Sequence, residues 1–218
     1  AEMAPVSLVP LLAHPLCRLG LGRDVLAQGA AALDIGTWRG LTVGRGVPGL
    51  EAALGNWEAI RESGHVPRPR KRLTAGDQAA AAKVLHALGA ASAALREAFA
   101  AETPSLAAVV TAARAAVTAF STSEAGTLLA FVGADGEALS GLFDDLASAE
   151  PAMPPSGTAR DFVAILDGLL AETVVKRKAS GYPRVAIWGL LEARLLEADH
   201  VVLGGLNETV WPPQTTTD

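Results

Sequence analysis

The clearest hydrophobic pattern in the chain covers residues 74–100, which contain no proline. Its apolar positions recur three or four residues apart and are Val84, Leu85, Leu88, Ala91, Leu95 and Phe99. This spacing places apolar side chains on one face of an α-helix. Thr74, followed three residues later by the acid Asp77, is a typical start signal of a helix. The pattern therefore predicts one long helix over residues 74–100.

Other stretches of the chain have the same helical period. They are residues 23–33, 50–61, 103–120, 137–149 and 158–176. Thr103 and Pro104 favour a helix start, because proline is tolerated in the first helical turn. Two glycines in residues 133–136 predict a turn, and the prolines in residues 151–155 predict a break between helices.

The segments between these helices contain residues that interrupt regular structure. Pro10 and Pro15 interrupt the apolar stretch of residues 6–16, and the glycine-rich residues 36–50 predict a loop. Residues 67–72 combine prolines with basic residues, and the restricted backbone before proline predicts an extended connector.

The pattern changes after residue 178. Residues 184–188 and 200–203 are β-branched runs, and residues 190–196 between them have a helical pattern. A strand, a short helix and a second strand are typical of a parallel α/β sheet. Two such strands are not stable alone, so we expect a fragment of a longer protein. The expected fold class is mainly α, with a helical subdomain in residues 1–181 and a small parallel α/β remnant in residues 182–218.

Composition agrees with a packed helical core. Half of the residues are apolar, and most of these are alanine and leucine, which lose little entropy in helices. Cys17 is the single cysteine, which excludes an internal disulfide or a cysteine metal cluster and predicts a buried apolar role. No apolar run approaches the ~20 residues of a membrane span, and no signal peptide is visible. We therefore expect a cytoplasmic protein with no membrane partner.

Charge is unevenly distributed along the chain. The net charge is −5, so the overall field does not favour nucleic acid. Residues 1–72 nevertheless have a basic excess. A local basic cluster can bind DNA phosphates in a salt-sensitive manner, or it can be a solvated connector. The basic candidates for DNA contact are Arg68, Arg70, Lys71 and Arg72.

Motifs for catalysis and nucleotide binding are absent from the sequence. It contains no Gly-x-x-x-x-Gly-Lys-Ser/Thr phosphate loop and no Gly-x-Ser-x-Gly nucleophile elbow. The four histidines do not have metal-ligand spacing. Asp144 and Asp145 are adjacent, and successive helical residues point about 100° apart, so we expect a solvated face. We predict no catalytic residue, metal or cofactor within this chain.

Residues 182–213 contain the most specific motif. It reads Gly204-Gly205-Leu206-Asn207-Glu208, followed by Trp211-Pro212-Pro213. This segment resembles the AddB family of the alphaproteobacterial type, and residues 14–20 and 136–139 also resemble that family.

The same segment is more distantly similar to the fifth motif of UvrD-like helicases. Ala193-Arg194, Leu196-Glu197 and residues 205–208 align with that motif. Three residues depart from it, at the positions of a histidine and two glycines, and they are Leu191, Leu195 and Thr209. A leucine in a turn that approaches a phosphate backbone would block the approach. The resemblance therefore implies a degenerate motor without ATP-coupled function at this motif.

The resemblance implies what the longer parent protein does. AddB-type subunits belong to heterodimeric helicase–nucleases that resect DNA double-strand breaks for homologous recombination. An AddA-like partner would supply the main motor, and the parent complex would use ATP and Mg²⁺ as a helicase and exonuclease. The nuclease domain and its iron–sulfur cluster would lie outside this chain. Residues 182–218 would be part of a RecA-like motor domain, and the chain would be a scaffold or DNA channel, inactive alone.

The implied DNA contacts include single strands and duplex ends. Besides the basic cluster, the residues expected at the cleft of the motor-like domain are Arg194, Glu197, Asn207 and Glu208. The alternative is a helical protein-interaction module with no nucleic-acid role. A self-contained enzyme is disfavoured, because no catalytic constellation is found.

Overall fold

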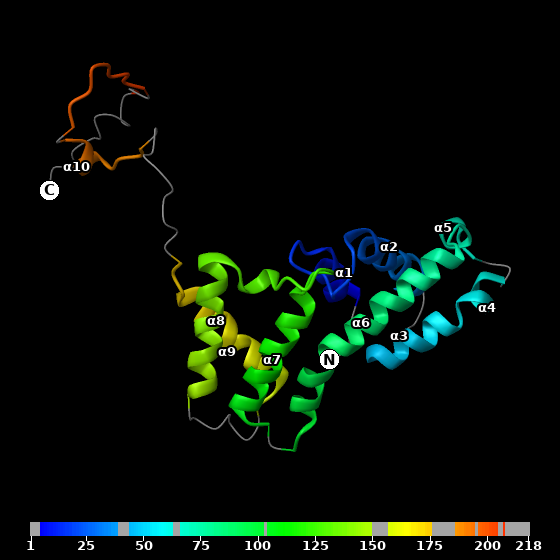
Figure 1. Ribbon diagram of the computed structural model, residues 1–218. Helices are drawn as coiled ribbons and strands as arrows, with labels where there is room; N and C mark the ends of the chain where they lie inside the picture. Colours follow the sequence, from blue (N-terminus) through cyan, green and yellow to red (C-terminus); the bar gives the residue numbers. More distant parts are fainter. Residues whose placement is uncertain are drawn as a thin grey trace. The chain divides into compact units, whose positions relative to one another are not determined.

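The computed structural model describes residues 5–38, 44–62, 66–102, 104–149, 157–175, 186–194, 196–204 and 207. The chain divides into two units, Ala1–Lys176 and Arg177–Asp218. The described part is mainly α-helical and contains no strand, so the expectation of a mainly α protein is confirmed (Figure 1). The predicted boundary after residue 181 lies outside the described residues.

Unit 1 contains most of the helices. In chain order they are α1 (Pro5–Ala13), α2 (Arg23–Leu33), the π-helix η1 (Asp34–Trp38), α3 (Gly46–Gly55), α4 (Trp57–Glu62), α5 (Arg68–Lys71), α6 (Ala75–Ala100), α7 (Leu106–Ser121), the 3-10 helix η2 (Leu129–Phe131), α8 (Gly133–Ser148) and α9 (Ala159–Glu172). In unit 2 the described helix is α10 (Leu190–Ala193).

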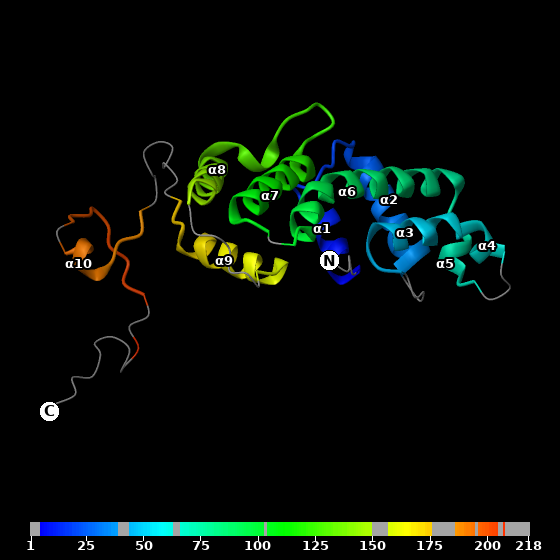
Figure 2. The ribbon, with the colours of Figure 1, turned by 90° about the horizontal axis from the view of Figure 1, so that it is seen from below.

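Helix α6 is shared by two hydrophobic cores of unit 1. Its 26 residues span about 39 Å at the helical rise of 1.5 Å per residue. The first half, including Val84 and Leu88, packs with α1, α2 and α3. The second half, including Leu95 and Phe99, packs with α7, α8 and α9. Figure 2 shows α6 between these two groups of helices. The single apolar stripe that predicts α6 therefore serves both cores.

The first core depends on a close crossing of α2 and α6. Gly29 lies in the middle of α2 and is buried. A Cβ atom at this position would be 2.5 Å from the carbonyl oxygen of Ala80 and 2.5 Å from Cγ2 of Val84. Glycine thus allows the two helix backbones to approach more closely than any other residue would.

The second core is built around aromatic side chains. Phe143 of α8 is 1 % exposed, and its ring meets that of Phe131 edge to face at a centroid distance of 6.4 Å. Phe162 attaches α9 to the end of α6 through a similar contact with Phe99, at 6.1 Å. Val109 of α7 belongs to the same core and is fully buried.

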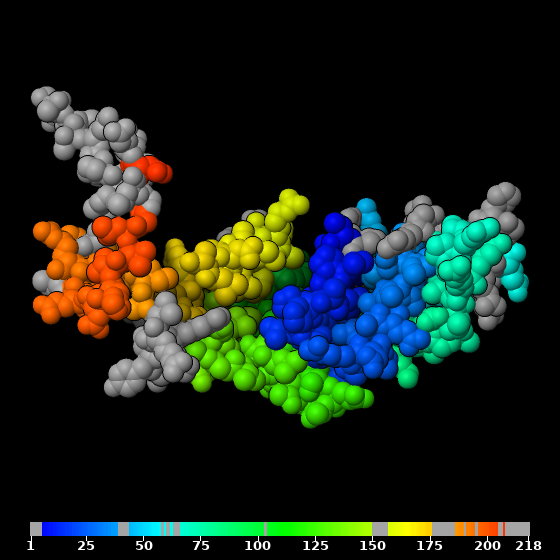
Figure 3. All heavy atoms as spheres, turned by 90° about the horizontal axis from the view of Figure 1, so that it is seen from above, coloured from blue at the N-terminus to red at the C-terminus, as the bar shows by residue number. Residues whose placement is uncertain are grey.

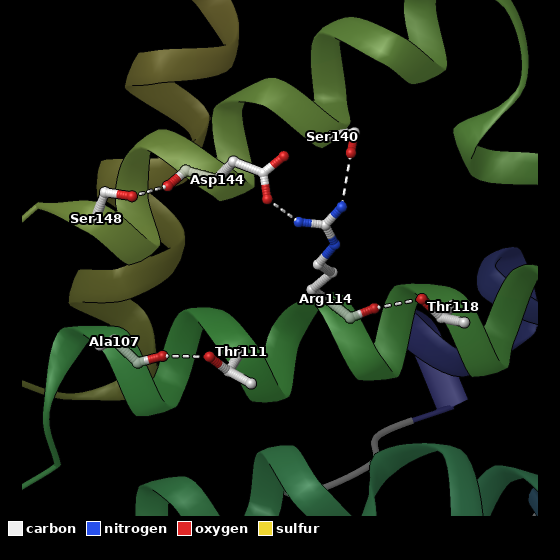
Figure 4. A network of polar contacts seen from close by, with 7 residues as sticks. All are labelled: Ala107, Thr111, Arg114, Thr118, Ser140, Asp144 and Ser148. Carbon is white, nitrogen blue, oxygen red and sulfur yellow. Dashed lines mark hydrogen bonds and ion pairs between the residues drawn. The ribbon is translucent and has the colours of Figure 1, made fainter.

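Arg114 joins α7 to α8 at the surface of the second core (Figure 4). Its Nη2 donates a hydrogen bond to Oγ of Ser140 at 2.7 Å, and its Nη1 pairs with the Asp144 carboxylate. The guanidinium also lies 5.7 Å from the centroid of the Phe131 ring. Asp144 is largely solvated, as the sequence predicts, and in addition forms this pair. Exposed pairs of this kind contribute roughly 0.2–1 kcal/mol.

The loop before α2 is attached to the C-terminal end of α7. The backbone N–H groups of Arg18 and Leu19 both donate to the carbonyl oxygen of Phe120, at 2.7 and 3.1 Å. Gly20 donates to the carbonyl oxygen of Thr122 at 2.7 Å. These bonds satisfy carbonyl groups that the end of a helix leaves without intrahelical partners. They also connect the two halves of unit 1.

The start of α6 is confirmed as predicted. Thr74 Oγ1 accepts a hydrogen bond from the Asp77 N–H at 3.2 Å, and the Asp77 carboxylate accepts one from the Thr74 N–H at 2.8 Å. Thr158 and Asp161 form the same reciprocal arrangement before α9. Thr74 and Asp77 predict the first start from the sequence, and the same pair of residue types explains the start of α9 at Thr158.

Other predicted boundaries differ from the structure. Helix α7 begins after Ser105, whose side chain accepts from the Ala108 N–H, and not at Pro104. The predicted turn at 133–136 is the first turn of α8. The single helix predicted for residues 50–61 is two helices, because α3 ends at Gly55 and α4 begins at Trp57.

Asp77 gives a prediction for the pH dependence of stability. Hydrogen bonds from Gln28 Nε2 at 2.9 Å and from Thr74 lower the pKa of this carboxyl. A pKa that is lower in the folded state adds stability above the unfolded value of about 3.9, and this stability is lost as pH falls through the folded pKa. The thermal midpoint of the wild type should therefore exceed that of Asp77→Asn at pH 6, and the gap should narrow below about pH 4.

Thermal melts followed by circular dichroism between pH 6 and pH 2.5 measure the difference in thermal midpoint between the wild type and Asp77→Asn. Gln28→Ala removes the hydrogen bond from Gln28 to Asp77. The difference in thermal midpoint between this variant and the wild type should therefore also narrow over the same pH range. A gap between wild type and Asp77→Asn that is constant over the whole range would contradict the assignment.

Unit 2 does not contain the predicted strands among its described residues. Residues 186–188 and 200–203 form neither helix nor strand, and the helix predicted for 190–196 is limited to α10. In this unit every residue whose side chain the structure describes is exposed. Ile187 is 98 % exposed and Val202 is 94 % exposed. The described residues of the chain alone therefore do not show the predicted α/β remnant. A strand is stable only when neighbours pair with its backbone.

Candidate nucleic-acid interface

The basic cluster forms a short helix, not the extended connector that the prolines predict. Pro67 precedes α5 and Pro69 lies within its first turn, where the missing proline N–H costs no hydrogen bond. The carbonyl oxygen of Pro67 accepts from the N–H groups of Arg70 and Lys71, at 3.0 and 3.3 Å. Buried Val66 and Leu73 flank this turn. The cluster therefore has a fixed backbone, held at both ends by the core.

Arg70 points inward from α5. Its side chain is 7 % exposed, and its Nε donates a hydrogen bond to the carbonyl oxygen of Ile35 at 3.3 Å. This carbonyl belongs to η1, where the π-helical geometry alters the regular hydrogen-bond pattern of α2. Burial of a guanidinium requires such acceptors. Arg70 therefore attaches α5 to η1, and its side chain is not at the surface where the sequence predicts the DNA contact.

The remaining basic side chains of the cluster are exposed. They are Arg68, Lys71 and Arg72. Figure 3 shows the surface of α5 and of the start of α6 in turquoise, beside the blue surface of α2. In the ribbon views this surface lies at the end of unit 1 away from α8 and α9 (Figures 1 and 2). Three exposed cations within one helical turn create a local positive field despite the acidic net charge.

A cavity of about 320 Å³ lies between α5 and η1. It is lined by Ala31, Asp34, Ile35, Pro67, Pro69 and Arg70. Its charged lining residues are Asp34 and Arg70, and the exposed cations of the cluster do not line it. The cavity therefore belongs to the contact between α5 and η1, not to the surface that would face a phosphate backbone.

The other candidate residues belong to unit 2. Arg194 follows α10 directly as its C-terminal cap. Arg194, Glu197 and Asn207 are exposed, and none of them has a described side-chain hydrogen bond. Glu208 lies outside the described residues. The structure thus groups Arg68, Lys71 and Arg72 around one turn of unit 1.

Cysteine, histidine and carboxylate side chains are the groups that would bind a metal or act in catalysis among the described residues. No cluster of three or more His, Cys, Asp or Glu side chains able to hold a metal occurs among them. Burial raises the pKa of the Cys17 thiol, which is 3 % exposed, so this cysteine is less nucleophilic than usual. His14 Nδ1 accepts a hydrogen bond from the Leu16 N–H at 3.2 Å. Within the described part, no helix is long and apolar enough to cross a membrane.

The sequence pattern identified the basic cluster but not the separate roles of its members. A run of basic residues in a sequence gives no sign of which side chain is buried, because the acceptor at Ile35 is 35 residues away. Pro67 and Pro69 lie before and within the first turn of α5, and these positions are typical of a helix start.

No protein-family model, curated protein or solved structure matches the chain.

Proposed function

We propose that the chain is part of an AddB-like subunit of a cytoplasmic helicase–nuclease that resects DNA double-strand breaks for recombinational repair. The observation that carries this proposal is the motif at residues 204–213, with its Gly-Gly-Leu-Asn-Glu and Trp-Pro-Pro sequences. Within that subunit the chain acts as a scaffold and a DNA-contacting surface. The sequence supports a non-catalytic role, because it has no phosphate loop and no nucleophile elbow.

Unit 2, in this proposal, is part of a RecA-like motor domain whose other strands are supplied from outside this chain. Exposed large apolar side chains support it, and they are Ile187, Trp188, Leu191, Leu196, Val201, Val202 and Leu203. The strands of a parallel α/β sheet are apolar because helices cover both faces. The β-branched runs around Ile187 and Val202 would pair with such a sheet, and α10 would cover part of one face.

Unit 1 is the helical subdomain that contacts DNA through α5. Arg68, Lys71 and Arg72 would bind phosphate groups, while Arg70 and the core hold the turn in place. Phosphate contacts position a protein on DNA without reading the bases, so binding should be similar for every sequence. In unit 2, Arg194 would contact a strand, and Glu197, Asn207 and Glu208 would contact it or hold the turn.

The proposal also specifies partners and cofactors of the parent protein. An AddA-like subunit would pair with it and supply the ATP- and Mg²⁺-dependent motor. An iron–sulfur cluster would belong to a nuclease domain that is not in this chain. The chain alone would neither hydrolyse ATP nor cut DNA.

A charge-reversal experiment tests the DNA-binding part. Lys71→Glu/Arg72→Glu should weaken binding to a blunt duplex and flatten its salt dependence, because each lost phosphate contact reduces the slope of log K against log salt by about 0.9. The expected loss is therefore roughly two units of slope. Fluorescence anisotropy with a labelled duplex, between 50 and 200 mM salt, measures both quantities for two unrelated sequences.

The matched control is Arg96→Glu/Arg160→Glu, which changes the net charge equally at exposed positions in α6 and α9. This variant should retain most of the wild-type affinity for the duplex and the wild-type slope of log K against log salt. Equal losses in both variants would indicate only a general charge effect. No binding by the wild type at 50 mM salt would favour the alternative, a helical protein-interaction module, to which the exposed apolar residues of unit 2 also correspond.

A further inference from the structure

We draw no further inference here: the strongest candidate, the cavity of about 460 Å³ between α1 and α2 with Leu12, Cys17 and Leu26 among its lining residues, is an apolar groove whose lining balances Arg18 and Arg23 against Asp24 and Asp34, so nothing in the structure shows what covers it.

Discussion

Phe143→Ala should lower the free energy of unfolding of unit 1 by about 3–5 kcal/mol. Phe143 is 1 % exposed and lies in the core shared by α6, α7, α8 and α9. Removal of its ring loses the transfer free energy of the buried atoms and leaves a cavity that the surrounding helices fill only in part. The edge-to-face contact with Phe131 is lost as well. Such a contact stabilises the fold by about 0.5–1.5 kcal/mol beyond the burial of the ring.

Urea denaturation followed by circular dichroism measures this loss. Val163→Ala is the matched control, because Val163 is an apolar residue of α9 that is 52 % exposed. Its effect should stay within about 0.5 kcal/mol. If Phe143→Ala cost no more than this control, Phe143 would not be a core residue and the packing of α8 on α7 would be wrong.

Gly29→Ala should destabilise unit 1 although alanine is the better helix former. The added Cβ would lie 2.5 Å from the Ala80 carbonyl oxygen, and this backbone atom cannot move without separating α2 from α6. Such overpacking costs about 1–3 kcal/mol, while the gain in helix propensity is at most about 1 kcal/mol. The expected net loss is therefore up to about 2 kcal/mol.

Gly141→Ala is the control for this prediction. Gly141 also lies inside a helix, α8, and a Cβ atom there would meet nothing within 4 Å. The same substitution should therefore raise stability by up to about 1 kcal/mol. The helix-propensity gain is common to both variants, so their free energies of unfolding should differ by the overpacking cost of roughly 1–3 kcal/mol. A stabilising Gly29→Ala would show that α2 and α6 do not cross as closely as described.

The sequence predicts those elements whose signals are local. Thr74 with Asp77, and Thr158 with Asp161, identify the starts of α6 and α9, because the capping bonds join residues three apart. The long stripe of α6 is equally local, since its period is visible within one helix. Ser105 shows the limit of this approach, because Thr103 and Pro104 predict the start of α7 and only the structure shows that Ser105 caps it.

Features that depend on distant residues could not be predicted in the same way. Burial of Arg70 depends on the carbonyl group of Ile35, and the close crossing at Gly29 depends on Ala80. In both cases the partner is far away in the sequence. The apolar runs around Ile187 and Val202 predict strands from composition, but strands require paired neighbours. This is why the structure shows the predicted helices but no strand among its described residues.

Hydrogen–deuterium exchange with and without a blunt DNA duplex tests the central claim most directly, which is that the chain contacts DNA through the exposed face of α5. Contact of DNA with α5 should slow hydrogen exchange in residues 66–74 when the duplex is added. Peptides from α8 and α9, at the other end of unit 1, should be unchanged (Figure 1). Protection confined to α8 and α9, or no protection anywhere under conditions where the duplex is bound, would contradict the account.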